Sequence, residues 1–574
     1  MQFDKIVAAY ELISATSKRT EMADVISNLV VPNKSEVRRI IYLLQGKIEM
    51  DINNVNLNIS NATIQEVLEN IANKQLNYND YGDIGLMAKS VIEKLENRVE
   101  VPINISDIFD TAKSLSLISG KNSVSNKIAI IGRLFKCVSP ESAKYIAKLF
   151  GGHLRLGIGE STIIDGVINS VITDKKMKKK IKAIIEDKYG IRNDLGYILS
   201  VFINEGIEAV NNIHMELFTP ISPMLANRAK SAEDGFNIMY KTGYCLQPKY
   251  DGLRAQVHYS RKQNRIEIYS RGLNRLTDMF PEICNEKFDE LIEDVIFEGE
   301  IISYNQDTME YYPFQDIMTR KRKKDIKEKM QNVPAYLFAF DVMYINGSDA
   351  TKLSYSNRLN ILDGVIRRSK FNNIIYTPTT FNPSKNEVEY LFNDYISKGL
   401  EGILLKNILS PYLPDKRTDD WLKLKRSYSG SMNDTVDVVV VGYKYGSGER
   451  VGKIGSLMCA IYNKEKEKYQ TICLAGSGLS DYDIEYYKNY FNDLQGISNN
   501  CDFKTTPDVY VEPNLVLEIL CDEITISPSH SSGYALRFPR IKQIRKDKNI
   551  NQITTYDEIV NMYNQQSRNN KTSD

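Results

Sequence analysis

The sequence predicts a multi-domain protein with an all-helical N-terminal domain, a mixed α/β domain and a small C-terminal β-barrel. Three observations lead to this prediction. The chain has 574 residues, which is too long for one ordinary core. Its apolar residues recur at helical spacing up to about residue 216, whereas shorter apolar runs typical of strands follow. From about residue 429 onward, Gly and Ser turns separate these runs, as in small barrels.

The segment 1–216 is expected to be helical throughout. Its first apolar residues share one helical face, and they are Phe3, Ile6, Val7, Tyr10 and Ile13. The same spacing recurs in VISNLV, IIYLLQ, IQEVLENIA and IGLMAKSVIEKL, without long strand-like alternation. Pro220 and Pro223 interrupt the pattern, so we place a domain boundary between residues 216 and 217.

The segment 217–428 is expected to mix strands with helices. Strands are predicted at RIEIYS, DVIFEGEII and AYLFAFDVMYING, and helices at SNRLNILDGVIRR and KNEVEYLFNDYISKGL. In the segment 429–562, the runs TVDVVVVGYKYG, SLMCAIYN, YQTICLAGSG and NLVLEILCDEITI predict the strands of the barrel. Residues 563–574 are polar enough to form a disordered tail.

The composition is typical of a folded protein that works outside the membrane. Hydrophobic residues make up 42% of the chain and charged residues 26%. No apolar run approaches the roughly 20 residues of a spanning helix, and the N-terminus lacks the pattern of a signal peptide. We therefore expect a cytoplasmic protein. The net charge of +1 does not by itself indicate nucleic-acid binding, although segments 319–324, 422–426 and 537–548 are locally basic.

Cysteine and histidine usage restricts the kind of metal site. The seven cysteines include no C-x-x-C pair, and the chain has only four histidines. A disulfide framework and a zinc site are therefore both poorly supported. Any metal is expected to be a hard cation held by carboxylates.

The most informative short motif is Lys249-Tyr250-Asp251-Gly252, with Arg254 close behind. A lysine amine is a good nucleophile once it is neutral, and nearby cations or burial lower its pKa. Alone, the motif should occur by accident in about one chain in ten of this length. An ordinary lysine in a surface turn is the alternative.

Carboxylates and lysines that could serve such a nucleophile follow in the sequence. Glu298 and Glu300 lie at the end of one apolar run, and Glu401 enters another, so together they could hold Mg²⁺ beside phosphate oxygens. Strand alternation places Lys423 and Lys425 on one face, where the two cations would repel unless an anion binds between them. The same cations would help to keep Lys249 unprotonated.

Phe340, in YLFAFDVMY, is expected at a strand end, either as a core residue or as a platform on which a base stacks. Gly157 and Gly159, in RLGIG, could let backbone amides approach a DNA minor groove, or could simply form a turn between helices.

In chain order, KYDGLR, SRGLNR, FEGE, FAFD, LEGILLK and WLKLK resemble the ordered motifs of covalent nucleotidyltransferases, namely ATP-dependent DNA ligases, RNA ligases and mRNA capping enzymes. PMLANRA, PFQDIMTRKRK and ALRFPRIKQIRKDK narrow the resemblance to the replicative-type DNA ligases of archaea and eukaryotes. LRLGIGEST, at 154–162, resembles their DNA-encircling N-terminal domain. The resemblance covers nearly the whole chain. It implies an all-α DNA-binding domain, an α/β (α+β) nucleotidyltransferase domain and an OB-fold barrel.

This resemblance implies an enzyme that seals nicks in double-stranded DNA with ATP and Mg²⁺, in replication, repair and recombination. Lys249 would attack the α-phosphate of ATP, and the resulting lysyl-AMP would pass AMP to the 5′-phosphate at a nick. The other implied roles are nucleotide binding by Gln247, Arg254, Arg271, Glu300, Phe340, Arg417, Lys423 and Lys425, metal binding by Glu300 and Glu401, orientation of pyrophosphate by Arg537, Arg540, Arg545 and Lys548, and DNA binding by Arg155, Gly157 and Gly159.

Gln247 departs from the family pattern. DNA ligases of this type commonly carry a glutamate two residues before the lysine, where it reads the amino group of adenine. A glutamine carbonyl can accept from the same amine, but a flipped amide would donate to O6 of guanine. Use of nucleotides other than ATP therefore stays open.

Two alternatives to a DNA ligase are considered. An RNA ligase or GTP-using capping enzyme would rarely carry a long helical N-terminal segment with GIGE. A non-catalytic DNA clamp would have lost catalytic residues, yet every expected nucleophile and acid is present. We expect a monomer that binds nicked DNA and no membrane. A sliding clamp remains open as a partner, because the sequence has no clear docking motif for one.

Overall fold

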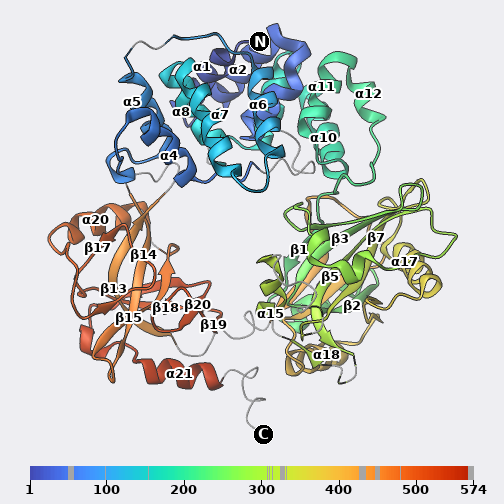
Figure 1. The fold of residues 1–574 in the computed structure, drawn as a ribbon. Coiled ribbons are helices and arrows are strands. Elements are labelled where there is room, and N and C mark those ends of the chain that lie inside the picture. The colour runs from blue at the N-terminus through green and yellow to red at the C-terminus, as the bar shows by residue number, and fades with distance from the viewer. Residues whose placement is uncertain are drawn as a thin grey trace.

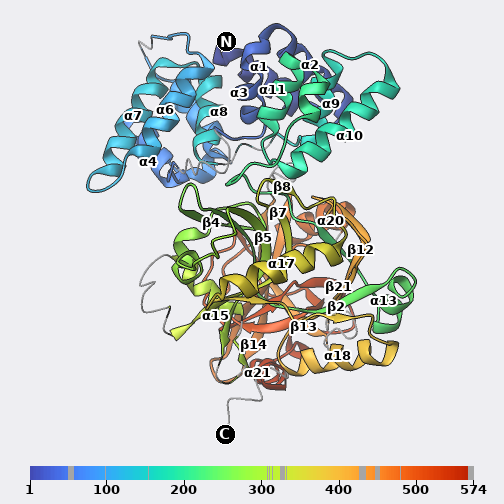
Figure 2. The ribbon, with the colours of Figure 1, turned by 90° about the vertical axis from the view of Figure 1, so that its right-hand side faces the viewer.

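The computed structural model of the chain describes residues 1–48, 57–96, 99–152, 154, 156–306, 308, 310–312, 314–322, 330, 332–425, 435–446, 453–478 and 480–565. In Figure 1 the helical N-terminal segment lies above two sheet-containing parts, which stand side by side below it. Figure 2, turned by 90°, keeps the helices on top and brings the two lower parts one behind the other.

Every named element between residues 1 and 211 of the described chain is a helix. These helices are α1 (Phe3–Ser14), α2 (Arg19–Val30), η1 (Val31–Glu36), α3 (Val37–Leu44), α4 (Asn61–Ala72), η3 (Tyr78–Asp80), α5 (Ile84–Glu93), α6 (Ile105–Leu117), α7 (Ser123–Cys137), α8 (Pro140–Phe150), α9 (Glu160–Asn169), α10 (Lys175–Ile191), α11 (Leu195–Glu205) and α12 (Ile207–Asn211). The predicted helical character of this segment is confirmed.

Apolar faces and capping residues explain why these helices form. Helix α1 buries the five residues that its spacing predicts. Ser60, Asp83 and Ser139 each accept a backbone N–H at the start of α4, α5 and α8, which satisfies a donor that the helix itself cannot pair. The buried core of this segment draws only on residues between Phe3 and Ile213. The N-terminal segment therefore has a core of its own.

The middle segment forms two mainly antiparallel sheets. The first sheet has the order β1–β12–β11–β2–β10, and the second has β4–β3–β5–β7–β8, with β6 beside β5 and β9 beside β7. The strands are β1 (Leu225–Arg228), β2 (Tyr244–Lys249), β3 (Leu253–Ser260), β4 (Arg265–Ser270), β5 (Asp294–Asn305), β6 (Glu310–Tyr311), β7 (Ala335–Ile345), β8 (Ser348–Asp349), β9 (Ile374–Tyr376), β10 (Thr380–Phe381), β11 (Gly402–Asn407) and β12 (Arg417–Lys425). The helical elements are α13 (Ala232–Met239), η4 (Thr277–Met279), α14 (Pro281–Cys284), α15 (Phe314–Met318), η5 (Thr319–Arg322), α17 (Tyr355–Ser369) and α18 (Lys385–Ser397).

Apolar clusters fix which faces of the two sheets meet. Cys245 and Trp421 of the first sheet share a buried cluster with Ile296, Phe340 and Met343 of the second sheet. On the opposite face of the first sheet, leucines and isoleucines of β2, β11 and β12 pack against helices α13 and α18. The two sheets therefore face one another.

The last segment is a second sheet-rich part, on the left in Figure 1. Its strands are β13 (Val436–Tyr445), β14 (Ile454–Asn463), β15 (Lys468–Ala475), β16 (Cys501–Asp502), β17 (Val509–Tyr510), β18 (Val516–Leu520), β19 (Glu523–Ile526), β20 (Tyr534–Arg537) and β21 (Arg540–Ile544), and its helices are α20 (Asp481–Asn492), η7 (Ile550–Gln552) and α21 (Tyr556–Gln565). The main sheet runs β16–β15–β14–β13–β18–β21, and β19 pairs with β20. Among the described residues no pairing of β16 with β21 closes this path into a barrel.

Two of the predicted domain boundaries lie in the C-terminal half of the chain. The tail was expected to begin at residue 563, but helix α21 continues to Gln565, because Tyr563 packs on the core of this segment and lies 5.1 Å, ring to ring, from Tyr534. The boundary expected between residues 428 and 429 lies outside the described residues.

The helical and middle segments meet where α10 ends. The backbone N–H of Ser222 donates to the carbonyl of Gly190, and Asn193 donates to the Ser222 hydroxyl. Among the described residues, no helix is both long and apolar enough to cross a membrane.

Candidate active site

The face of the first sheet that meets the second sheet carries the predicted nucleophile. Alternation along β2 places Cys245, Gln247 and Lys249 on this face. Strand register then aligns them with residues of β11 and β12. Three rows result, namely Lys249, Gly402 and Lys425, then Gln247, Leu404 and Lys423, and last Cys245, Lys406 and Trp421. The sequence correctly predicted that Lys423 and Lys425 share a face, since Leu422 and Leu424 are buried on the other.

The second sheet faces this surface with acids and an arginine. Arg254 of β3 is paired in register with Glu300 of β5, and Gln256 with Glu298. We expected Glu298 and Glu300 at a strand end, and this is wrong, because buried Ile301 and Ile302 continue β5 beyond them. The carboxylates therefore come from the middle of a strand.

Phe340 also lies inside its strand rather than at its end. Strand β7 continues through buried Val342 and Met343, so the expected position is wrong. The register between β5 and β7 shifts at this point, from Glu298 opposite Asp341 to Gly299 opposite Ala339, and leaves Phe340 as the extra residue. Such a bulge redirects a side chain. The Phe340 ring lies 6.2 Å from the ring of Trp421, between the two sheets.

Lys249 is held by a carboxylate. Its Nζ lies 2.5 Å from Oε2 of Glu401, and Nζ of Lys425 lies 2.9 Å from the same oxygen. Burial disfavours the charged amine, but Glu401 and then Glu300 outweigh burial and raise the pKa of Lys249. The expectation that neighbouring cations keep this lysine neutral is therefore wrong in this structure, because its nearest charged partner is the anion Glu401.

The two expected metal ligands, Glu300 and Glu401, both interact electrostatically with this lysine. Burial raises the pKa of Glu300 to about 7, against the effect of Lys249 and Arg254, and the carboxylate of Glu401 contributes to the rise. Burial also disfavours the charged form of Glu401, yet Lys249 and Lys425 lower its pKa to about 2. No group of three or more His, Cys, Asp and Glu side chains could enclose a metal in the described part of the chain. Two carboxylates beside a nucleophile fit a cation such as Mg²⁺, which keeps part of its shell for water and phosphate.

Several cations surround Lys423. Burial lowers its pKa to about 8, and the positive charges of Arg417, Lys425, Lys249 and Arg271 act in the same direction. Like charges held this close repel one another, so the arrangement favours a bound anion with several negative charges. This cluster unites residues of β2, β12 and the turn after β4, as predicted from the separate motifs.

Arg254 is held rigidly. Its guanidinium lies 2.6 Å from Oε2 of Glu298 and donates to the carbonyl of Met224 at 2.7 Å. The Tyr412 hydroxyl donates to the same oxygen of Glu298 at 2.9 Å and accepts the backbone N–H of Met224. Tyr412 was given no role from the sequence, where no pattern links it to a glutamate so far away along the chain.

Gln247 is almost completely buried, with 1% of its surface exposed. Its Nε2 donates to Oγ1 of Thr379 at 2.9 Å, and its Oε1 accepts from the hydroxyl of Tyr355 at 3.1 Å. Its amide is therefore bonded at both ends by protein groups.

Only one of the four basic residues expected to orient pyrophosphate faces the nucleophile motif. Arg537 lies 3.8 Å from Asp251, and 2.5 Å from Glu523 of its own segment. Arg540 pairs with Asp522, and both Arg545 and Lys548 pair with Asp437. In this arrangement the last three residues are therefore held within the C-terminal segment.

The expected DNA-binding glycines lie at the start of α9. A Cβ built on Gly157 or Gly159 would meet no heavy atom of the described chain within 4 Å, so packing does not demand glycine at either position. Gly157 has a φ of +70°, which favours glycine for its backbone. Arg155 lies outside the described residues.

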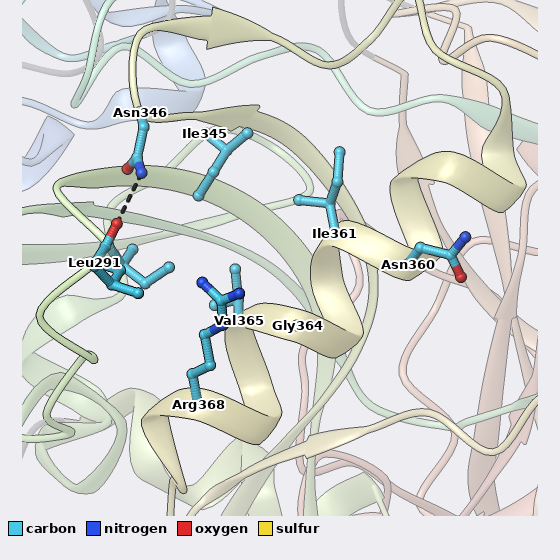
Figure 3. A pocket seen from close by; sticks show the side chains of 9 residues that line it. Leu291, Ile345, Asn346, Asn360, Ile361, Gly364, Val365 and Arg368 are labelled. Carbon is cyan, nitrogen blue, oxygen red and sulfur yellow. Dashed lines mark hydrogen bonds between the residues drawn. The ribbon is translucent and has the colours of Figure 1, made fainter.

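Figure 3 shows a pocket lined by α17, the end of β7 and the segment around Leu291. It is lined by Leu291, Ile345, Ile361 and Arg368, among others, and Asn346 closes one side by donating to the carbonyl of Leu291. None of the predicted site residues lines it.

Three family models match the chain in order. The model described as DNA ligase N terminus matches residues 2–167, that for the ATP dependent DNA ligase domain matches residues 223–425, and that for the ATP dependent DNA ligase C terminal region matches residues 450–548.

Curated relatives are similar along their whole length. A protein of Dictyoglomus turgidum named "Probable DNA ligase" is 35% identical over 99% of this chain and 98% of its own. The DNA ligase of Sulfophobococcus zilligii is 33% identical over 98% of this chain and 96% of its own. The DNA ligase of Nitrosopumilus maritimus is 30% identical over 99% of each chain. A solved structure named Pmar-Lig_PreS3 has a similar fold, with a TM-score of 0.54 at 17% identity over 94% of this chain and 99% of its own.

Proposed function

Because the chain belongs to the family of ATP-dependent DNA ligases, which seal nicks in DNA with ATP and a divalent metal such as Mg²⁺, we propose that Lys249 is the residue that carries the nucleotide. The observation that supports this assignment most directly is the position of Lys249, between the cation cluster around Lys423 and the carboxylates Glu300 and Glu401.

The first step joins Lys249 to the nucleotide. Its Nζ, once deprotonated, attacks the α-phosphorus of ATP, the bond to the β-phosphate oxygen breaks, and pyrophosphate leaves. Lys423, Lys425, Arg417 and Arg271 neutralise the phosphates during this transfer. A cation held by Glu300 and Glu401 would supply further charge neutralisation at the phosphates.

The next two steps use the bound AMP to seal the nick. The 5′-phosphate oxygen at the nick attacks the phosphorus of the lysyl-AMP and releases Lys249. The 3′-hydroxyl then attacks the 5′-phosphorus and AMP leaves. Arg254, held by Glu298, is assigned to the ribose or the 5′-phosphate, and Phe340 to stacking on the base.

Arg537 is the C-terminal residue best placed to assist the first step. It already faces Asp251 of the nucleophile motif, so it could meet the leaving pyrophosphate. Arg540, Arg545 and Lys548 would have to leave their present carboxylate partners to share this role.

We assign residues 1–216 to an all-α DNA-binding domain, 217–428 to the nucleotidyltransferase domain, and the segment from 429 to an OB-fold domain that extends to Gln565. The separate core of the first segment and the antiparallel path β15–β14–β13–β18 support these assignments. We further propose a monomer in the cytoplasm, since one chain supplies all the site residues and no disulfide joins its described cysteines.

Covalent labelling tests the central assignment. The protein is incubated with Mg²⁺ and ATP or GTP labelled at the α-phosphate, then denatured, and the label on the protein is measured. Lys249→Ala should abolish labelling. Lys262→Ala, at an exposed lysine in a turn of the same segment, should label like the wild type. Labelling of Lys249→Ala would refute the assignment.

A second assay identifies the acceptor. Nicked duplex DNA and nicked RNA are offered to the labelled protein, and joined strands are resolved by size. We expect sealing of DNA, and joining of RNA alone would favour an RNA ligase instead.

Deletion of residues 1–216 tests the DNA-binding domain. Labelling by ATP should persist, because the remaining segments have their own cores, whereas affinity for nicked duplex should fall strongly. Unchanged affinity for nicked duplex would refute the DNA-binding role.

A further inference from the structure

A buried lysine lies one row beyond Gln247 on the inner face of the first sheet. Lys406 has no exposed surface, and its Nζ lies 4.0 Å from the ring centre of Trp421 and 4.3 Å from that of Phe340. No carboxylate of the described chain lies within ion-pair distance of it. Among the described residues, the hydroxyl of Tyr355, at 2.9 Å, is the one polar group that contacts its Nζ. A buried ammonium without an ion pair is costly, so its retention calls for an explanation.

The contact with Tyr355 begins a chain of hydrogen bonds. The Tyr355 hydroxyl donates to the carbonyl of Phe340 at 2.7 Å or to Oε1 of Gln247 at 3.1 Å. Nε2 of Gln247 donates to Oγ1 of Thr379, whose own hydrogen is given to the carbonyl of Thr377 at 2.8 Å. The chain therefore runs from a buried ammonium, through the amide of Gln247, to a backbone carbonyl.

The numbers of donors and acceptors restrict the direction of donation along this series of hydrogen bonds. An ammonium can only donate, so the Tyr355 oxygen accepts from Lys406. The Thr379 hydroxyl has used its single hydrogen, so it can only accept from Gln247. A flipped amide would place two acceptors, Oε1 of Gln247 and Oγ1 of Thr379, against each other. It would also turn an amide N–H toward the Tyr355 oxygen, which already accepts from Lys406, so the Tyr355 hydrogen would have to go to the carbonyl of Phe340.

The orientation of this amide matters for the nucleotide base. Adenine carries an amine at position 6, which donates, whereas guanine carries a carbonyl there, which accepts. An amide that can flip serves both bases, while an amide held in one orientation favours one of them. The base stacks on Phe340 in the proposed function, and Phe340 contacts both Lys406 and Tyr355.

We propose that Lys406, acting through Tyr355, fixes the amide orientation of Gln247 and thereby decides which purine nucleotide the enzyme accepts. Lys406 and Tyr355 are positioning residues, since neither is placed against the reacting atoms. The proposal rests on the proposed function, in which Lys249 captures the nucleotide.

This arrangement responds to pH. Burial lowers the pKa of Lys406 to about 7, and the charges of Arg254 on β3 and Arg358 on α17 act in the same direction. Asp341 on β7 and the Cys245 thiol on β2 oppose this effect. Below pH 7 the ammonium donates to Tyr355. Above it, the neutral amine can accept the Tyr355 hydrogen, and the amide of Gln247 keeps only its bond to Thr379.

Base discrimination by the full-length protein tests the proposal. Covalent labelling is measured over a range of concentrations of ATP and of GTP, with Mg²⁺, between pH 6 and 9, so that KM and the maximal labelling rate are obtained separately. The variants are Tyr355→Phe, which removes only the hydroxyl, and Lys406→Met. Lys127→Met is the control, because Lys127 is also buried and donates to one carbonyl, that of Leu57, but lies in the N-terminal segment.

We expect the wild type to discriminate between the two nucleotides through KM, and to discriminate less as the pH rises above 7. In Tyr355→Phe and Lys406→Met the ratio of the two KM values should move toward one by about tenfold, the equivalent of one hydrogen bond. The maximal labelling rates of these two variants should change little, and their KM ratios should no longer depend on pH. The control Lys127→Met should keep the wild-type KM ratio and its pH dependence.

Other outcomes overturn the proposal. The proposal fails if the wild type has equal KM values for ATP and GTP. It also fails if Tyr355→Phe folds and keeps the wild-type ratio of the two KM values at every pH. These tests remain decisive even if Lys406→Met does not fold. If the wild type forms no adduct with either nucleotide, the proposed function itself fails. If the variants form the adduct and discriminate between ATP and GTP as the wild type does, only the role of Lys406 and Tyr355 is refuted.

Discussion

Glu401 lies 2.5 Å from Lys249, so the proposed nucleophile and an expected metal ligand form an ion pair. The amine cannot attack while it holds its proton, and Glu401 stabilises that proton. With a cation held by Glu401 and a phosphate held by Lys425, Lys249 would lose this partner and its pKa would fall. Substrate binding itself would thus activate the nucleophile.

Glu401→Gln should impair nucleotide capture. An amide binds Mg²⁺ less strongly than a carboxylate, so labelling at limiting Mg²⁺ should fall by about 100-fold and recover partly at high Mg²⁺. The measurement is covalent labelling with ATP as a function of Mg²⁺ concentration. Glu389→Gln, at an exposed glutamate of α18, is the control. A normal Mg²⁺ dependence in Glu401→Gln would remove this residue from the metal site.

Arg537→Ala should slow the first step selectively. Arg537 faces Asp251 across the two segments, whereas Arg545 is bound to Asp437 and Asp547 within one segment. We expect labelling by ATP to fall by about 100-fold, as when one charge-stabilising group is lost. Sealing of a nick that already carries AMP should change by only a few-fold.

Arg545→Ala is the comparison for this prediction. Because its partners are carboxylates of its own segment, its loss should lower the stability of that segment more than the rate of labelling. Equal losses of labelling in the two variants would contradict the distinction.

His258 should make the nucleotidyltransferase segment sensitive to acid. The backbone N–H of Phe218 donates to its Nδ1, and Oε1 of Gln256 lies 2.8 Å from its Nε2, so the neutral ring fits and a second ring hydrogen does not. Burial lowers the pKa of His258 to about 3. The unfolded chain therefore binds more protons between about pH 6.5 and 3, and stability falls as the pH decreases, by up to about 1.4 kcal/mol per pH unit.

Denaturant unfolding of His258→Asn at several pH values measures this effect. The variant keeps an acceptor for Phe218 but cannot titrate, so its stability difference from the wild type should shrink as the pH falls from 6.5 toward 4. His214→Asn, at an exposed position, is the control for replacing a histidine elsewhere in the chain. A stability difference for His258→Asn that does not change with pH would contradict the prediction.

Local sequence patterns predicted helices and strands, and they predicted which motif residues share a face. The period of two along β12 placed Lys423 and Lys425 on one face, and helical spacing predicted the buried face of α1. Phe340 and Glu300 lie inside their strands, whereas the polar residues beside them suggest that each apolar run ends there. The buried residues that follow them, Val342 and Ile301, in fact continue the strands.

Partners that lie far apart in the sequence could not be predicted in the same way. The family resemblance groups Arg545 with Arg537, and no local pattern reveals that Arg545 is held by Asp437, 108 residues away. Lys406 ends an apolar run and received no role, since its aromatic surroundings come from β7, α17 and β12. Such contacts depend on the packing of the two sheets, which no local pattern encodes.

Tyr412→Phe should loosen the support of Arg254. The hydroxyl of Tyr412 accepts from Met224 and donates to Glu298, and Glu298 in turn holds Arg254. Its loss leaves a buried backbone N–H and a carboxylate oxygen without this partner, which should destabilise the segment by about 1–3 kcal/mol. The denaturant midpoint of the segment measures this loss.

The same variant should weaken nick sealing more than covalent labelling, if Arg254 serves the 5′-phosphate at the nick. Tyr390→Phe, at a tyrosine that is 68% exposed, is the matched control and should affect neither stability nor sealing. A Tyr412→Phe protein as stable as the control would show that water replaces the hydroxyl. Equal losses of labelling and sealing would instead assign Arg254 to the nucleotide, because both steps require the bound ribose.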